Sequence, residues 1–196
     1  MFGDPCFGTV KYLNVTYECR PGLGVCPAVC PTEWTKINQQ EDGVQWGAMG
    51  DSYGSWQVAS TICGQKLKLQ HRSGGISCAV SLGRYGKFGC GVHTRAWSSL
   101  LAVYVTEGKG SDYVIVPSVL PHAGITLNEI YIGLYQRSGY NSMSPYVEFD
   151  LPLNADNSYF CFEEGKEYQL WHGKDMYDTD ESRNDGTTYT DIYIMS

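Results

Sequence analysis

The chain has 196 residues, of which 42% are hydrophobic and 18% charged, and its formal net charge is −7. This composition is typical of a folded globular protein and excludes a disordered chain. The first 90 residues carry a net charge of +2 and the rest −9, which argues against a nucleic-acid-binding surface.

Composition also indicates the fold class. The 15 tyrosines and 23 glycines favour strands and tight turns, and no segment shows the apolar spacing of a helix, so we predict a mainly β fold. No apolar run approaches the roughly 20 residues that span a bilayer. We therefore expect no membrane span.

The cysteine content indicates disulfides and an oxidising compartment, because the number is even and the chain is a small β protein. The disulfide candidates are Cys6, Cys19, Cys26, Cys30, Cys63, Cys78, Cys90 and Cys161. Zinc is an alternative for Cys26 and Cys30, whose spacing suits metal ligands. From the cysteines we expect a secreted, extracellular protein. Because no signal peptide follows Met1, we also expect this sequence to be a fragment.

The first predicted unit, residues 2–20, consists of a turn and a strand. The turn has the sequence GDPCFG, in which proline disfavours a helix and the glycines allow a tight backbone path. The next ten residues, VKYLNVTYEC, alternate between two faces as a strand does. They contain a glycosylation sequon at Asn14, which a secreted protein could use.

This unit resembles the C-terminal end of the rhamnose/galactose-binding lectin domain, the family named after a sea urchin egg lectin. The run DPCFGTVKYL and the cysteine that ends the strand carry the similarity, which covers residues 2–19 only. The resemblance implies a disulfide-stapled domain that binds a sugar without a metal. Asp4 would accept hydrogen bonds from sugar hydroxyls, Lys11 would donate one, and the backbone around Gly8 would line the site.

From this resemblance we predict a carbohydrate-binding protein without a cofactor, a metal or an enzymatic activity. Its partners would be glycans that carry galactose or rhamnose, including glycoproteins of the cell surface or matrix. The other half of the domain should precede residue 1, and residues 63–87 resemble it only loosely. An adhesive matrix protein with a relic sugar site is the first alternative, and a secreted hydrolase on residues 45–196 is the second.

The remaining chain divides into a linker and a β-rich domain. Residues 20–31 are rich in proline and glycine, which is typical of a linker. We therefore assign residues 1–20 to the partial lectin segment, 21–44 to the linker and 45–196 to an extracellular β-rich domain of unknown family.

Many short strands separated by turns predict that this last part is a β-sandwich or a barrel-like domain. Two of its segments, SLLAVYV and DYVIVPSV, are almost wholly apolar and are expected to be buried on both faces. The other predicted strands are QKLKLQH, NEIYIGLYQ, YVEFDLPL, EYQLWHG and TYTDIYIM.

An acidic segment follows the predicted strand EYQLWHG. It contains Asp175, Asp178, Asp180, Glu181 and Asp185. Such a density of carboxylates could hold calcium, but the EF-hand pattern is absent and we favour a solvated acidic turn. Trp171 and His172, just before it, are expected to pack at the end of the strand.

Catalytic motifs are missing from the sequence. The four histidines His71, His93, His122 and His172 are scattered, and no metalloprotease, serine hydrolase or phosphate-loop pattern occurs. Cys78 or Cys90 could act as a nucleophile beside a histidine, although a disulfide is the favoured interpretation. The paired carboxylates of a glycosidase cannot be recognised from spacing.

Overall fold

The structure, a computed structural model, describes residues 33–79, 83–91, 100–109, 113–117, 125–127, 133–179 and 181–196. This part of the chain is mainly β, as predicted, with one short helix, α2 (Gly173–Met176), and a 3-10 turn, η3 (Glu181–Arg183). The strands are β1 (Trp34–Lys36), β2 (Val44–Gly47), β3 (Gly54–Trp56), β4 (Ile62–Gly64), β5 (Lys66–Ser77), β6 (Leu100–Leu101), β7 (Val103–Thr106), β8 (Val114–Val116), β9 (Ile125–Leu127), β10 (Tyr135–Arg137), β11 (Tyr146–Asp150), β12 (Phe160–Phe162), β13 (Tyr168–His172) and β14 (Asp185–Met195).

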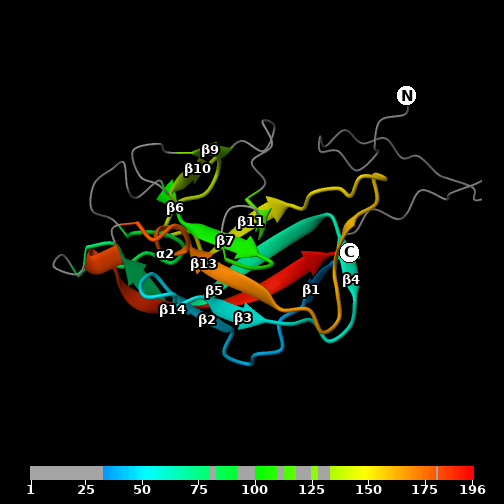
Figure 1. Cartoon of the computed structure of the whole chain (residues 1–196), viewed down its shortest axis with the longest axis horizontal. Coiled ribbons are helices and arrows are strands. Elements are labelled where there is room, and N and C mark those ends of the chain that lie inside the picture. The colour runs from blue at the N-terminus through cyan, green and yellow to red at the C-terminus, as the bar shows by residue number, and fades with distance from the viewer. Residues whose placement is uncertain are drawn as a thin grey trace, which may run out of the picture.

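Two antiparallel sheets form the body of the molecule (Figure 1). The first has the order β1-β14-β5-β11, and β2 pairs with the other end of the long strand β14. The second has the order β3-β13-β7-β8. Two smaller sheets have the orders β6-β10-β9 and β12-β4. Each sheet therefore brings together strands that are far apart in the sequence.

The core lies between the two main sheets. Leu67 and Leu69, which alternate on β5, are fully buried. Within the same sheet they lie beside the apolar residues of β14 and β11 that pair with them. They share one buried cluster with Trp56 and Leu170 of the second sheet. Burial of apolar surface on both inner faces therefore holds the sheets together as a sandwich.

The first of the two apolar runs, SLLAVYV, is buried where the structure describes it, as predicted, whereas Tyr113 of the second run, DYVIVPSV, is 54% exposed. Every residue from Leu100 to Thr106 is inaccessible or almost so. The reason is its central position, because β7 lies between β13 and β8 in the second sheet. The alternating strand β11 behaves differently, since Val147 and Phe149 are buried while Tyr146 and Asp150 are exposed.

Part of the predicted linker, residues 21–44, lies within the first sheet. β1 pairs with the end of β14, and Ile37 and Val44 belong to the buried cluster. Residues 34–44 are therefore a structural part of the β domain. The division between residues 1–20 and the linker lies outside the described residues and stays a prediction.

Two disulfides confirm the disulfide prediction for four of the eight cysteines. Cys63 and Cys161 join β4 to β12, and Cys78 and Cys90 join the end of β5 to the loop that follows it. The remaining candidates, Cys6, Cys19, Cys26 and Cys30, lie outside the described residues, as does the zinc alternative for the last two.

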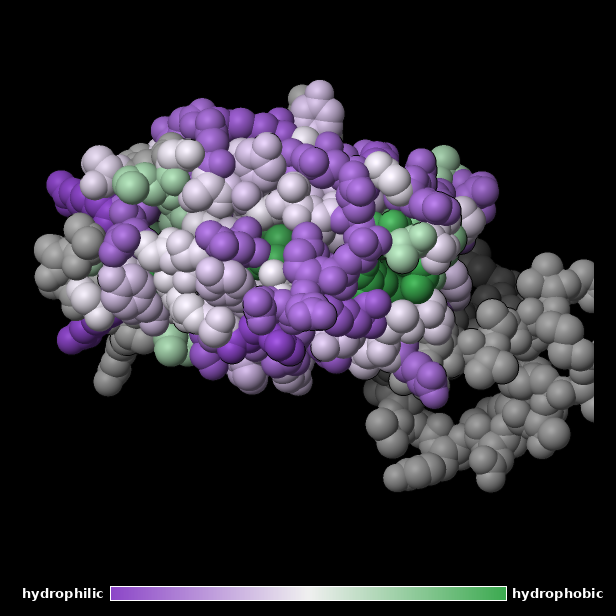
Figure 2. Space-filling model, turned by 90° about the horizontal axis from the view of Figure 1, so that it is seen from below, coloured by the Kyte–Doolittle hydropathy of each residue, from purple (hydrophilic) through white to green (hydrophobic). Residues whose placement is uncertain are grey.

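One face of the sandwich, seen in Figure 2, is mostly hydrophilic. Figure 2 shows it from below, the side on which Figure 1 places β3 and the loop between β1 and β2, and only small hydrophobic areas interrupt it. Among the residues that the structure describes, no helix combines the length and apolar composition needed to cross a bilayer.

Candidate functional site

The residues predicted to bind sugar, Asp4, Gly8 and Lys11, lie outside the described residues, as does the sequon at Asn14. The acidic segment is described except for Asp180 and the side chain of Glu181. Its remaining carboxylates have three different partners. Asp175 binds backbone N–H groups, Asp178 pairs with a lysine, and Asp185 accepts a hydrogen bond of 2.9 Å from the hydroxyl of Tyr85.

Asp175 fixes the loop between β2 and β3. It lies in α2, directly after β13, and is fully buried. Its Oδ1 accepts the backbone N–H of Asp51 and its Oδ2 that of Ser52, both at 2.9 Å. Hydrogen bonds to an ionised carboxylate are stronger than neutral ones, and the buried charge is solvated by them. Asp175 therefore holds this loop against the end of the second sheet.

Two glycines allow α2 to begin where it does. A Cβ on Gly173 would overlap the carbonyl of Gly133, and Gly133 itself has a φ of +82°. Only residues without a side chain permit this close approach of two backbones. The approach positions Asp175, two residues further on, where it reaches the β2–β3 loop.

An ion-pair cluster lies on the surface above Asp175. The Nζ of Lys109, in the loop after β7, is 2.6 Å from Asp51 Oδ1 and 3.1 Å from Asp178 Oδ1. The three side chains are 41%, 58% and 69% exposed, in the order Lys109, Asp51, Asp178. The hydrogen bonds to Asp51 and then to Asp178 raise the pKa of Lys109 above its ordinary value. Such exposed pairs add little stability, but they hold three charged groups in a fixed arrangement.

An exposed aromatic ring lies beside this cluster. Tyr53 stacks on the buried Trp171 with ring centroids 4.6 Å apart, and 40% of its surface remains exposed. The indole N–H of Trp171 donates to Gln169 Oε1 at 2.8 Å, and Lys109 Nζ lies 5.8 Å from the Trp171 ring. The stack keeps the outer face of Tyr53 open to solvent.

We refer to Asp51, Tyr53, Lys109 and Asp178 together as the Lys109 site. It contains hydrogen-bond acceptors, a cationic donor and a flat apolar face within one small surface. Sequence reasoning singled out only Asp178, because the other residues come from two loops distant in the sequence. The glycines around Tyr53, in the run GDSYG, were the one local signal that a loop is exposed there.

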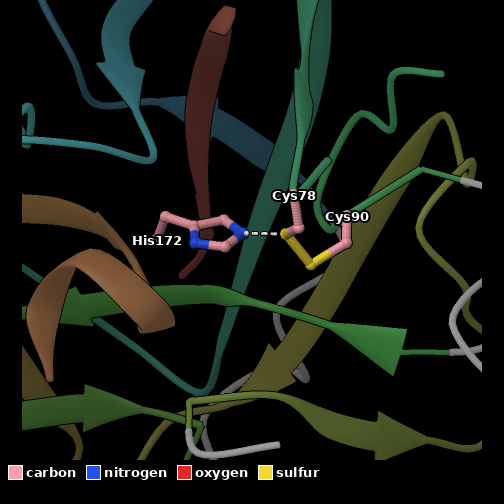
Figure 3. A group of neighbouring side chains, drawn as sticks. All are labelled: Cys78, Cys90 and His172. Carbon is pink, nitrogen blue, oxygen red and sulfur yellow. Dashed lines mark hydrogen bonds between the residues drawn. A yellow bond between two sulfur atoms is a disulfide. The ribbon is translucent and has the colours of Figure 1, made fainter. Parts of the chain in front are cut away.

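The group formed by Cys78, Cys90 and His172 lies in the interior (Figure 3). His172 is fully buried and its Nε2 is 3.8 Å from Sγ of Cys78, which is disulfide-bonded to Cys90. Burial, and secondarily the charge of Lys174, lowers the pKa of His172 to about 3, so the ring is neutral. Oxidised sulfurs cannot attack a substrate, and the alternative of a cysteine nucleophile at Cys78 or Cys90 is therefore wrong.

The expectation that Trp171 and His172 pack at a strand end is confirmed, because both are buried at the end of β13.

His71 forms no catalytic pair with Cys78 or Cys90, because the two sulfurs are bonded to each other. It lies on β5, where one ring nitrogen is 3.1 Å from the carbonyl oxygen of Gly74, and burial lowers its pKa. His93 and His122 lie outside the described residues.

The sandwich of antiparallel sheets with these loops at its end is a lectin-like fold. The structure is similar to the solved structure of AJLec, a lectin from the sea anemone Anthopleura japonica. The match has a TM-score of 0.68 and 26% sequence identity, and it covers 82% of this chain and 95% of that chain. No protein-family model matches the chain, and no curated protein matches it.

Proposed function

We propose that this protein is an extracellular lectin that binds glycans carrying galactose or rhamnose. The observation that carries the proposal is the similarity to AJLec, which extends over nearly all of that lectin and most of this chain. The sugar type is supported by the resemblance of residues 2–19 to the rhamnose/galactose-binding domain. The disulfides Cys63–Cys161 and Cys78–Cys90 support an oxidising, extracellular compartment.

The Lys109 site has the chemistry that recognition of a sugar requires. Each carboxylate has two oxygens with several lone pairs, so Asp51 and Asp178 can accept from hydroxyls while they hold Lys109. Lys109 uses two of its three N–H donors in these pairs and can direct the third to a sugar oxygen. The open face of Tyr53 offers an apolar surface to the C–H groups of a pyranose.

A single shallow and exposed site of this kind binds weakly. We expect a Kd of the order of 1 mM for a monosaccharide, which corresponds to about −4 kcal/mol. The N-terminal residues Asp4, Gly8 and Lys11 form the second part of the proposal. Two sites in one chain, or several chains on one surface, would raise the apparent affinity for a multivalent glycan.

Titration calorimetry with D-galactose and L-rhamnose tests the proposal, together with binding to immobilised glycans. Tyr53→Ala and Asp178→Asn should each weaken binding about tenfold, a loss of about 1.4 kcal/mol. Tyr146→Ala and Asp150→Asn are matched controls, because these residues are similarly exposed on β11, and they should leave binding unchanged.

Asp4→Asn with Lys11→Met tests the N-terminal residues separately. Loss of binding in this variant alone would place the sugar site in residues 1–20 and not at the Lys109 site. Absence of binding to every sugar by the wild-type protein would refute the proposal and favour the adhesive matrix protein.

A further inference from the structure

The Lys109 site lies at one end of a row of polar side chains on the outer face of the second sheet. β3 and β13 are neighbours in this sheet (Figure 1), and Ser55 lies opposite Gln169. Side chains alternate between the two faces of a strand, so Tyr53, Ser55 and Gln57 lie on the same face. All three are exposed, whereas the two residues between them are buried.

Side chains of β13, and of the residue that precedes it, continue this row. The indole N–H of Trp171 donates to Gln169 Oε1 at 2.8 Å, and Gln169 Nε2 donates to Glu167 Oε1 at 3.3 Å. These three side chains share one face because they are two residues apart along the chain. The hydrogen bonds therefore orient the row, from the stack of Tyr53 on Trp171 to Glu167, before a ligand binds.

A hollow of about 220 Å³ lies at the far end of the row. Its lining includes Ser55, Gln57 and Glu167 from the row and Gln40 from the β1–β2 loop. Successive side chains on one face of a strand are about 7 Å apart, so the row from Tyr53 to Gln57 is about 13 Å long. This length exceeds that of one pyranose ring.

The row can bind hydroxyl groups beyond the Lys109 site. An amide has two N–H donors and two lone pairs on its oxygen, and a carboxylate has two oxygens, so Gln169 and Glu167 can form further hydrogen bonds. The exposed hydroxyl of Ser55 can donate and accept. None of the described residues that line the hollow is basic, and Glu167 is acidic. A ligand with carboxylate or sulfate groups would therefore meet a like charge.

We propose that the ligand of the Lys109 site is a neutral oligosaccharide. One of its units stacks on Tyr53, and the following units lie along Ser55 and Gln169 toward the hollow. The inference rests on the proposed function, because it extends that site and defines the size and charge of its ligand. Translational and rotational freedom is lost once for each ligand molecule, so every added unit that makes contacts increases the affinity.

Titration calorimetry on the whole protein tests the inference with galactose, galactobiose and galactotriose, and with rhamnose and its di- and trisaccharides. For the sugar that binds, the Kd of the trisaccharide should be at least about tenfold lower than that of the monosaccharide. The double variant Ser55→Ala/Gln57→Ala should reduce this gain to about threefold, the statistical advantage of three identical units, and leave the Kd of the monosaccharide unchanged. Gln136→Ala, an exposed glutamine on β10, is the control and should keep the whole gain.

Two further arms test the shared site and the charge of the ligand. Tyr53→Ala should weaken the binding of monosaccharide and trisaccharide by the same factor, because both occupy the Tyr53 position. Trigalacturonic acid, which has a carboxylate on every unit, should bind at least about tenfold more weakly than galactotriose. Equal binding of the two trisaccharides would overturn the restriction to neutral ligands.

The outcomes distinguish this inference from the proposed function. Equal affinity for the monosaccharide and the trisaccharide would overturn the inference and leave the Lys109 site as a site for one sugar unit. A gain that Ser55→Ala/Gln57→Ala retains would overturn it as well, because the additional contacts would then lie elsewhere. Absence of binding for every sugar would refute the proposed function and the inference together.

Discussion

Replacement of Asp175 by asparagine should destabilise the protein and loosen the β2–β3 loop. Asn has one carbonyl oxygen where Asp has two carboxylate oxygens, so its NH2 group must face either the N–H of Asp51 or that of Ser52. The buried N–H at that position loses its acceptor, and the remaining hydrogen bond becomes a neutral one. Hydrogen bonds to a charged group contribute about 1.5–3 kcal/mol, and we expect a loss of unfolding free energy of this size.

Thermal and urea unfolding measure the effect. For a protein of this size, 1 kcal/mol shifts Tm by about 2–4 °C, so Asp175→Asn should lower Tm by about 3–12 °C with an unchanged urea m-value. Asp150→Asn is the matched control, because this carboxylate is 66% exposed and its lysine and arginine partners lie 3.9 Å and 3.7 Å away. It should change stability by less than about 0.5 kcal/mol. Equal stability of wild type and Asp175→Asn would refute the anchoring role.

Three further changes test the interior. The pKa of His172 is about 3 in the folded protein and about 6.5 unfolded, so the unfolded state binds more protons in this window. The contribution of His172 to the unfolding free energy should therefore be fully present above about pH 6.5 and be lost toward pH 3, a fall of up to about 5 kcal/mol. Urea titrations across this pH range should show a smaller fall in His172→Phe. Gly173→Ala should lower the unfolding free energy by at least about 2 kcal/mol, because the new Cβ would overlap Gly133. Gly108→Ala is the control and should lower it much less, since its Cβ would meet only the Tyr113 ring at ordinary contact distance. A similar Tm for the two variants would contradict the close approach of Gly173 and Gly133. Loss of Cys63–Cys161, which closes a segment of 98 residues, should lower the unfolding free energy of the Cys63→Ala/Cys161→Ala variant by about 3–5 kcal/mol, and an unchanged urea midpoint would contradict this.

The strands that the sequence predicted are those whose signal is local. β5, β11 and β14 alternate or are strongly apolar, and a period of two residues is sufficient to recognise a strand with one buried face. β1 was missed because it has only three residues, Trp34–Lys36, and two of them are exposed polar residues. Its position depends on the last residues of β14, which no local pattern contains.

The Lys109 site could not be predicted for a related reason. Asp51, Lys109 and Asp178 are separated by more than fifty residues from one another, and the fold of the second sheet brings them together. The acidic segment was recognised, but as a group of equivalent carboxylates. The pairing of Cys63 with Cys161 is likewise a consequence of the register between β4 and β12, which the cysteine count does not contain.

Two residues of that acidic segment, Asp175 and Asp178, have different roles, which a pair of variants can separate. Asp175 points inward and holds the β2–β3 loop, whereas Asp178 is 69% exposed and forms its ion pair at the surface. Stability should therefore depend on Asp175 and sugar binding on both residues, because Asp51 and Tyr53 lie in the loop that Asp175 holds. Asp178→Asn should weaken binding without lowering Tm by more than about 4 °C, since an exposed pair contributes at most about 1 kcal/mol. Asp175→Asn should reduce both quantities. A variant at Asp175 that lost stability but bound sugar as tightly as the wild type would show that the loop does not need its anchor for recognition.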